Sequence, residues 1–309
     1  MKVVVTGASG FIGSHVLPLL AARGCEVIAA SRTPVGLSDV AWRLSPDLGA
    51  GSDWSRVLQG ADAVVHLAGR AHVLGGGTDE VSLCHRINTD GTKRLARQAM
   101  EAGVRHFVFL SSCHAVAAQS PHALSRLTLP RPSSAYGQSK LAAERALQDE
   151  LEPSACAWTI LRPPLVYGRG NRANFARVAG LVRSGWPVPL RGVRNRRSFI
   201  GAANLADFIL RGCLLNKNSQ GKIFYPADES DLSTPELLRL IGQSMGRKTR
   251  LFFLPRVLLR ALSGMPGLRP LQTLTASLFV DKTPNVDELR WRAPHETSRL
   301  LDNMFAPES

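Results

Sequence analysis

The 309-residue chain lacks several features that would assign it to common protein classes. No apolar run approaches the roughly 18 to 20 residues that a membrane-spanning helix needs, and the opening MKVVVTGASG does not resemble a signal peptide. The five cysteines are scattered and form no C-x-x-C pair, as is typical of reduced thiols in the cytoplasm. The eight histidines form no H-E-x-x-H motif or Cys/His cluster. We therefore expect a cytoplasmic protein with no integral membrane segment and no metal.

Acidic residues are missing from one long span, residues 153–206. The net charge of +14 would suit a nucleic-acid partner, but no aromatic-rich RNA-binding pattern accompanies it, so none is expected. A region of one charge sign also concentrates small polyanions such as a sugar diphosphate, although most of these arginines are expected to form a solvated face. The span contains nine arginines: Arg162, Arg169, Arg172, Arg177, Arg183, Arg191, Arg194, Arg196 and Arg197.

Apolar runs alternate with helical patterns through the first half of the chain. Continuous apolar strands separated by helices indicate a parallel sheet covered on both faces, and right-handed crossovers then give a Rossmann-type doubly wound α/β fold. Residues 1–165 are expected to form this nucleotide-binding domain. Residues 166–309, richer in Pro, Gly and Arg, are expected to form a smaller mixed substrate-binding region, with part of 190–220 returning to the first domain. The basic amphipathic stretch LPRVLLRALSG could lie on a membrane, but packing on the domain is the preferred interpretation.

The segment VTGASGFIG places Gly7, Gly10 and Gly13 between the first strand and the first helix. Glycines there allow close backbone approach to a pyrophosphate, and the helix N-terminus supplies amide hydrogens. NAD sites usually carry an acid at the end of the second strand, but this chain has Ser31 followed by Arg32. An arginine suits a ribose 2′-phosphate, so NADP(H) is favoured and NAD(H) remains possible.

The segment YGQSK places Tyr136 and Lys140 four residues apart, on one face of a predicted helix. A nearby ammonium is expected to lower the pKa of the phenol, which would let it exchange a proton with a sugar oxygen while a nicotinamide exchanges hydride with the attached carbon.

These motifs occur in a recognisable order: the glycine loop, VVHLAG, RINTDGT, FVFLSS, Y-x-x-x-K and RPPLVYG. In this order they resemble the extended short-chain dehydrogenases/reductases of the nucleotide-sugar epimerase/dehydratase family, over nearly the whole chain. The resemblance implies that Ser112 hydrogen-bonds the reacting sugar oxygen, Tyr136 is the acid/base and Lys140 also holds the nicotinamide ribose. It implies a nucleotide-sugar substrate and a possible homodimer built on helices 81–102 and 134–151.

The resemblance also implies further binding residues. Asn88 would support the active-site backbone, Arg197 would bind the substrate diphosphate and Asn174 would help to place it; helix and loop capping is the alternative for both asparagines. The substrate site would comprise Ser112, Cys113, His114, Tyr136, Asn174 and Arg197. The cofactor site would comprise Gly7, Gly10, Phe11, Ile12, Gly13, Ser31, Arg32, Asp47, Leu48, Leu67, Ala68, Gly69, Tyr136, Lys140 and Pro163.

Dehydratases of this family place Asp-Glu just after the serine, where this chain has Cys113 and His114. Water elimination is therefore not expected. His114 is expected to be structural, with a proton relay as the alternative, and Cys113 to be a packed side chain, although a nucleophilic thiol is left open.

Two reactions at C4 of the sugar remain. The second half resembles bacterial reductases of UDP-4-keto-6-deoxy-N-acetylglucosamine, which serve polysaccharide and O-antigen synthesis, and Arg32 suits the NADPH that they consume. We therefore favour a 4-keto reductase, with a UDP-glucose or UDP-N-acetylglucosamine 4-epimerase carrying bound NAD as the alternative. A catalytically silent cofactor-binding scaffold is disfavoured because Ser112, Tyr136 and Lys140 occur together. Asn204 and Arg290 depart from the family's usual Asp and Gly, and both are expected to be structural.

Overall fold

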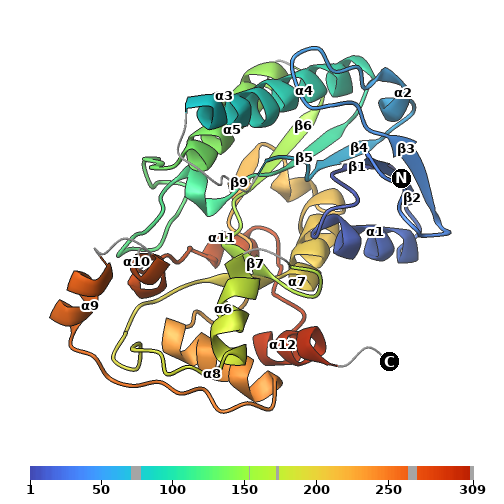
Figure 1. Ribbon diagram of the computed structural model, residues 1–309. Helices are drawn as coiled ribbons and strands as arrows, with labels where there is room; N and C mark the ends of the chain where they lie inside the picture. The colour runs from blue at the N-terminus through green and yellow to red at the C-terminus, as the bar shows by residue number, and fades with distance from the viewer. Residues whose placement is uncertain (71–77, 153, 172–173, 264–269, 307–309) are drawn as a thin grey trace.

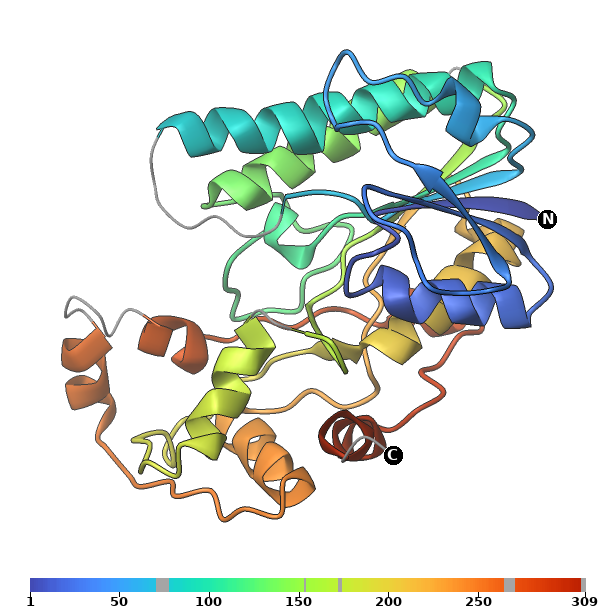
Figure 2. The same ribbon diagram turned by 45° about the vertical axis from the view of Figure 1, so that its right-hand side comes forward.

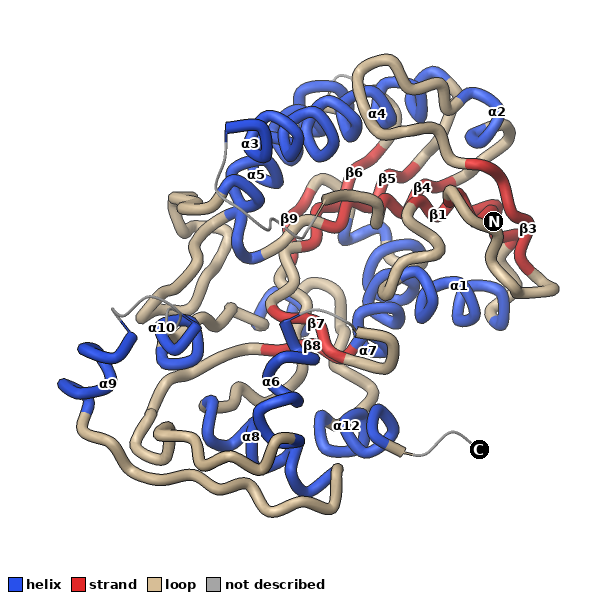
Figure 3. The backbone as a smooth tube through the Cα atoms, viewed as in Figure 1, coloured by secondary structure: helices blue, strands red, loops and turns tan. Residues whose placement is uncertain are grey.

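The computed structural model describes residues 1–70, 78–152, 154–171, 174–263 and 270–306. Its centre is a seven-stranded parallel sheet in the order β3-β2-β1-β4-β5-β6-β9, and β7 and β8 form a separate parallel pair (Figure 3). The strands are β1 Lys2–Thr6, β2 Glu26–Ser31, β3 Val40–Leu44, β4 Ala63–His66, β5 His106–Leu110, β6 Ala157–Leu161, β7 Leu165–Tyr167, β8 Phe199–Gly201 and β9 Lys222–Phe224.

Helices cover both faces of the sheet (Figures 1 and 2). The α-helices are α1 Gly13–Ala22, α2 Ser55–Leu58, α3 Thr78–Cys84, α4 Gly91–Glu101, α5 Ala135–Leu151, α6 Asn174–Arg183, α7 Ala202–Asp207, α8 Thr234–Ser244, α9 Arg256–Ser263, α10 Pro270–Thr275, α11 Thr283–Asp287 and α12 Thr297–Phe305. Two π-helical segments, η1 His85–Asp90 and η3 Phe208–Leu214, continue α3 into α4 and extend α7; η2 Cys113–Ala115 and η4 Lys217–Ser219 are single 3₁₀ turns.

The predicted doubly wound sheet is confirmed, and its strands are apolar for the reason expected. The five residues of β5 and the four of β4 are all buried, because α4 and α5 pack on one face of the sheet while α1 and η3 pack on the other. Four strands were not predicted from the sequence: β3 and β9 of the large sheet, and the short pair β7 and β8. In β3 only Val40 is buried, since the strand lies at the sheet edge, and β9 has only three residues.

The chain beyond β6 forms a second cluster of elements. Helices α6, α8 and α12 pack around a core that includes Tyr167, Phe175 and Phe199. The chain also returns to the large sheet: α7 and η3 pack beside α1, and β9 pairs with β6. A later segment adds Leu289 and Trp291 to the same core as α1. We keep 1–165 and 166–309 as proposed functional regions, joined by this returning segment.

Both departures from the family pattern lie in structural positions. Asn204 is fully buried, donates to Asp228 Oδ1 (2.7 Å) and to the His295 carbonyl (2.9 Å), and accepts from the His295 amide. Arg290 has φ 51°, the only positive φ of a non-glycine residue in the described chain. That left-handed conformation favours the glycine that the family usually has there.

Candidate active site

The glycine loop after β1 is shaped for close backbone approach. Gly7 has φ 67°, and a Cβ added there would lie 2.7 Å from the Ala68 amide nitrogen, so no larger residue fits. The loop then enters α1, and within the described chain the amides of Phe11, Ile12 and Gly13 find no hydrogen-bond acceptor. Three unpaired amides at a helix N-terminus suit an anionic group, so the residues present fit the pyrophosphate of a dinucleotide.

A cavity of about 830 Å³ opens beside this loop. It collects nine of the predicted cofactor residues: Gly7, Gly10, Ser31, Arg32, Asp47, Leu48, Leu67, Ala68 and Gly69. It is also lined by seven residues that were not predicted: Ser9, Ala30, Ser45, Pro46, Arg70, Arg86 and Ile87. Arg70 follows the VVHLAG strand and Arg86 opens RINTDGT, so their place beside known motifs was the signal that could have found them.

The end of β2 presents a cation and no acid to the cavity. The Ser31 side chain is buried and occupied: its hydroxyl donates to the Thr33 carbonyl (2.6 Å) and accepts from the Trp42 indole (3.2 Å). Arg32 is exposed at the cavity wall. Arg70 and Arg86 also line the cavity; the Arg70 guanidinium pairs with Glu80 (3.2 Å), and Asp47 is the acid in the lining, so arginines outnumber acids there, which suits a phosphate-rich ligand.

Six predicted cofactor residues do not line this cavity. Tyr136 and Lys140 lie next to it, at the catalytic corner described below. The Phe11 ring packs edge-on against His15 and lies near Gly168. Ile12 packs on the apolar core, Gly13 opens α1, and the Pro163 carbonyl accepts from the Cys113 amide (3.0 Å).

The predicted catalytic pair lies in the first turns of α5. The Ser134 side chain caps the helix by accepting from the Gly137 amide (3.1 Å), which fixes where the helix begins. A Cβ on Gly137 would lie 2.3 Å from the His114 carbonyl oxygen, so this glycine lets α5 pack directly on η2. That close packing brings Tyr136 next to Ser112, whose hydroxyl accepts from the His114 amide (3.2 Å).

Lys140 is buried beneath the cofactor cavity. Its ammonium donates to the Leu110 carbonyl (2.8 Å), lies 4.6 Å from the centre of the Phe109 ring, and would be 3.2 Å from a Cβ added at Gly69. Burial lowers the pKa of Lys140 to about 8. The ammonium is thus held against Gly69, a residue of the cavity wall.

Burial raises the pKa of Tyr136 to about 12, partly opposed by hydrogen bonding to Ser112. We expected Lys140 to lower it, and the structure shows the opposite direction. Without a ligand, desolvation of the phenolate outweighs the attraction of a lysine that is itself bonded to a carbonyl. The protein alone therefore holds Tyr136 as a neutral acid at pH 7.

The two residues after Ser112, Cys113 and His114, begin the 3₁₀ turn η2 and are both held in neutral form. Cys113 is buried, and burial raises the pKa of its thiol to about 12, so it is no thiolate nucleophile at neutral pH. Burial and the nearby Arg197 both lower the pKa of His114, which keeps the imidazole neutral. Arg197 pairs with Leu278, and Leu278 packs in the same buried cluster as Cys113, so the structure brings Arg197 near the residues that follow Ser112.

Arg197 is positioned by backbone groups. Its guanidinium Nη1 donates to the Thr273 carbonyl (2.6 Å) in α10 and to the Ala276 carbonyl (3.1 Å). Its own amide donates to the Leu232 carbonyl (3.0 Å). No carboxylate neutralises it among the described residues, which leaves its charge available to an anionic substrate group.

Asn88 joins three parts of the site. Its side-chain oxygen accepts from the Arg70 amide (2.8 Å), and its nitrogen donates to the Arg70 carbonyl (3.1 Å) and to the Ser139 hydroxyl (2.9 Å). It lies in the π-helical segment η1, a distortion that often marks functional sites. Asn88 therefore ties the strand-end loop to α5, between Tyr136 and Lys140. Asn174 opens α6, and its side chain lies outside the described residues.

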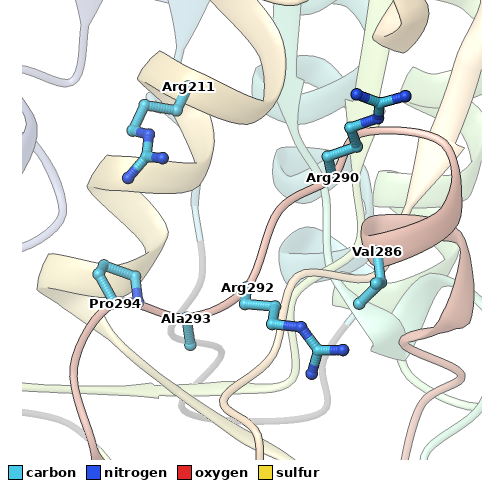
Figure 4. A pocket seen from close by; sticks show the side chains of 6 residues that line it. All are labelled: Arg211, Val286, Arg290, Arg292, Ala293 and Pro294. Atoms are coloured by element: carbon cyan, nitrogen blue, oxygen red, sulfur yellow. The ribbon is translucent and has the colours of Figure 1, made fainter.

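A second hollow, of about 420 Å³, is lined by Arg211, Val286, Arg290, Arg292, Ala293 and Pro294, none of them a predicted site residue (Figure 4). Its three guanidinium groups point in different directions and form no joint anion site. Elsewhere, no group of His, Cys, Asp and Glu in the described residues has a metal-binding arrangement. Among the same residues, no helix is both long and apolar enough to cross a membrane.

Comparison with known proteins agrees with this geometry. Residues 3–224 match the model of the NAD dependent epimerase/dehydratase family. The UDP-glucose 4-epimerase of Vibrio cholerae is 30% identical over 95% of this chain and 91% of its own length. The N-acetyl-alpha-D-glucosaminyl-diphospho-ditrans,octacis-undecaprenol 4-epimerase of Escherichia coli O157:H7 is 26% identical over 82% of this chain and 75% of its own.

A solved structure shares the fold over its full length. MoeE5 in complex with UDP-glucuronic acid and NAD superposes with a TM-score of 0.80 at 25% identity, covering 99% of this chain and 98% of that one. The chain that carries the glycine loop, the strand-end cavity and the Y-x-x-x-K helix thus matches both a family model and a solved structure of the same fold. The chain is an enzyme of the NAD dependent epimerase/dehydratase family, with a Rossmann-like fold.

Proposed function

We propose that the chain is a 4-epimerase of a UDP-sugar. The observation that carries this proposal is that α5, with Tyr136 and the buried Lys140, packs on the turn after Ser112, while Arg197 pairs with Leu278 in the cluster of Cys113. The V. cholerae and E. coli relatives are both named 4-epimerases, which supports epimerisation over the 4-keto reduction that we favoured from the sequence.

The roles that we propose follow from the geometry. A nicotinamide dinucleotide, when bound, supplies reversible hydride exchange at C4 of the sugar. Tyr136 exchanges the proton of the 4-hydroxyl, and Ser112 holds that oxygen in line with the phenol. Lys140 places its ammonium under the cofactor ribose, and Arg197 binds the substrate diphosphate. The pair Cys113–His114 offers no carboxylate for water elimination, so the 4-keto sugar is not dehydrated.

One observation favours a second candidate, a 4-keto reductase that uses NADPH. The β2 end carries Arg32 and an occupied Ser31 hydroxyl, with no acid to bind a 2′-hydroxyl. The solved relative MoeE5 holds NAD, so a preference for NADP(H) in this chain is our proposal. Replacing Arg32 with Ala should weaken NADP(H) binding about 10- to 100-fold and leave NAD(H) binding within about twofold.

The test is a pair of reactions with the same purified protein. In the first, UDP-glucose or UDP-N-acetylglucosamine is incubated with NAD or NADP, and the C4 epimers are separated by chromatography. In the second, UDP-4-keto-6-deoxy-N-acetylglucosamine is incubated with NADPH, and cofactor absorbance is followed. Epimer formation without net cofactor consumption supports the epimerase. Stoichiometric NADPH loss supports the reductase instead.

The Tyr136→Phe variant is the control for both reactions and should abolish either signal. If the wild-type protein binds the cofactor but converts none of these sugars, both functions are contradicted. The homodimer that we propose, through the surface of α4 and α5, is tested separately by light scattering during gel filtration, where a monomer mass would exclude it.

A further inference from the structure

Five large apolar side chains are exposed along one edge of the C-terminal region. They come from the loop after α6, from the segment that joins α8 to α9 and from the first turn of α9. We call them the apolar edge: Trp186 (76% exposed), Phe252 (44%), Phe253 (65%), Val257 (77%) and Leu258 (51%). Large aromatic and aliphatic side chains at this exposure are costly to hydrate, so a cluster of them marks an interaction surface.

The two segments of the apolar edge lie side by side. The Val188 amide donates to the Arg250 carbonyl (2.8 Å), the Phe252 amide to the Val188 carbonyl (3.1 Å), and the Arg191 amide to the Phe252 carbonyl (3.1 Å). The Phe253 ring lies over Gly192, because a Cβ there would be 2.7 Å from its Cε2. In Figure 1 the segment from α8 to α9 runs along the lower side of the molecule, past the loop that follows α6.

Basic residues surround the apolar edge, and acids are missing from it. Neither span that builds it, 153–206 nor 237–280, contains an Asp or Glu, and together they hold sixteen of the 38 basic residues. The rest of the chain has 22 basic and 24 acidic residues, so the net positive charge belongs to these two spans. The exposed cations beside the apolar edge are Arg183, Arg191, Arg247, Lys248 and Arg250.

A row of Trp, Phe and aliphatic side chains rimmed by Lys and Arg is the composition that binds the interface of an anionic bilayer. A second copy of the chain is a poor occupant, because it would bring two basic surfaces together. Nucleic acid would match the charge and could stack on the aromatic rings, but it gives no partner to the aliphatic Val257 and Leu258.

We propose that the apolar edge docks the enzyme on the surface of an anionic membrane, with Trp186, Phe252, Phe253, Val257 and Leu258 entering the headgroup region. Leu259 of α9 is buried, so the helix packs on the protein through one side while Val257 and Leu258 stay exposed. We preferred packing alone for this stretch from the sequence, and the structure shows only part of its apolar surface packed.

The docking edge is close to the substrate side of the active site. Helix α9 contacts α10, and the Thr273 carbonyl of α10 accepts a hydrogen bond from Arg197. A docked enzyme would therefore present the corner around Arg197 near the bilayer surface. The docking itself does not depend on which sugar is used, and it is measured without any substrate.

The test is flotation of the full-length protein with phosphatidylcholine vesicles, with and without phosphatidylglycerol. We expect binding to the anionic vesicles and none to the neutral ones. Replacing Trp186 and Phe253 with Ser should weaken that binding at least about tenfold, while the matched change of Leu44 and Leu215 to Ser should not, because these exposed leucines lie outside the edge. Circular dichroism and the melting temperature establish that each variant is folded.

A second pair of variants tests the charge. Lys248→Glu with Arg250→Glu should abolish binding to anionic vesicles, and Arg23→Glu with Lys217→Glu should retain most of it. The proposal is overturned if the wild-type protein does not float with anionic vesicles, or if the Ser variant binds as well as wild type, since charge alone would then explain the binding. Tighter retention on single-stranded RNA than on vesicles would overturn it in favour of a nucleic acid.

Discussion

The sheet half and the C-terminal region position their functional residues by different means. In the first half, regular backbone pairing aligns the parallel strands, so the glycine loop, Arg32 and Ser112 all follow strand ends at the carboxyl side of the sheet. In the second half, strands have three residues and loops are held by single buried side chains. Asn195 alone bonds Thr234, Leu274 and Ala276. The residues on the cofactor side are therefore positioned by the repeated backbone hydrogen bonds of a parallel sheet. Those on the substrate side are positioned by a few side-chain hydrogen bonds.

The largest effect should come from the catalytic corner of the sheet half. Tyr136→Phe removes the proton donor and acceptor and should lower kcat by about 10²- to 10⁴-fold. Cofactor affinity and melting temperature should change little, because the substitution removes one hydroxyl and keeps the aromatic ring. Steady-state kinetics and cofactor titration measure both. The control Tyr225→Phe, which alters a structural hydroxyl bonded to Arg162, should keep kcat within about threefold.

The next prediction tests whether the stability of the sheet half depends on side-chain contacts as well as on backbone hydrogen bonds between strands. Glu144 of α5 and Arg162 form a buried ion pair with several hydrogen bonds, to which Ser111 and Tyr225 add their hydroxyls. Glu144→Ala leaves the guanidinium buried without a counter-charge and should lower the free energy of unfolding by about 3–5 kcal/mol. Urea denaturation measures it. The exposed pair partner Glu26→Ala should cost under about 1 kcal/mol.

Asn195→Ala makes the corresponding test in the C-terminal region. It leaves the Thr234 amide without its acceptor and removes one of the two donors to each of the carbonyls of Leu274 and Ala276, so we expect a loss of about 1–3 kcal/mol. Because the carbonyl of Ala276 also holds Arg197, the substrate KM should rise while cofactor affinity stays constant. A parallel loss of cofactor binding would show that the two regions are not positioned independently.

Lys140→Met tests the cost of burying a cation for function. The lysine has a pKa of about 8 in the fold and 10.5 unfolded, so between these values the unfolded chain binds more protons and stability rises with pH. Below pH 8, burial of the charged ammonium lowers the free energy of unfolding by its full amount. The Met variant, inactive, should be more stable than wild type by about 1–2 kcal/mol at pH 7. Urea titrations from pH 7 to 10.5 should show this advantage shrinking; an advantage that grows with pH would contradict the assignment.

The smallest effect concerns backbone strain in the C-terminal region. Arg290→Gly relieves a left-handed conformation and should raise the free energy of unfolding by about 1 kcal/mol, with unchanged kinetics. Arg292→Gly, at a neighbouring position without a positive φ, should destabilise the protein or leave it unchanged. Equal gains for both variants would rule out strain as the cause.

The sequence predicted most of the features that the parallel sheet positions. The parallel sheet follows from apolar runs that recur strand after strand. The glycine loop and the pair Tyr136–Lys140 follow from short motifs at the ends of those strands. It did not reveal β3, since an edge strand with one buried residue has no apolar signature. It missed Arg70 and Arg86: Asn88 in η1 bonds the backbone of Arg70, which brings the loop of Arg70 to the segment that contains Arg86. It also reversed the pKa direction of Tyr136, because the depth of burial is a three-dimensional property.

The strand β9 has a consequence for engineering this enzyme. The chain leaves the sheet after β6, builds β7, α6 and β8, and then comes back to add the last strand before leaving again. A substrate region from another enzyme therefore cannot be exchanged as one continuous cassette. Any graft must either spare residues 202–224 and the patch of Leu289 and Trp291, or bring its own replacement for both, so new specificities are more accessible by rebuilding loops than by swapping halves.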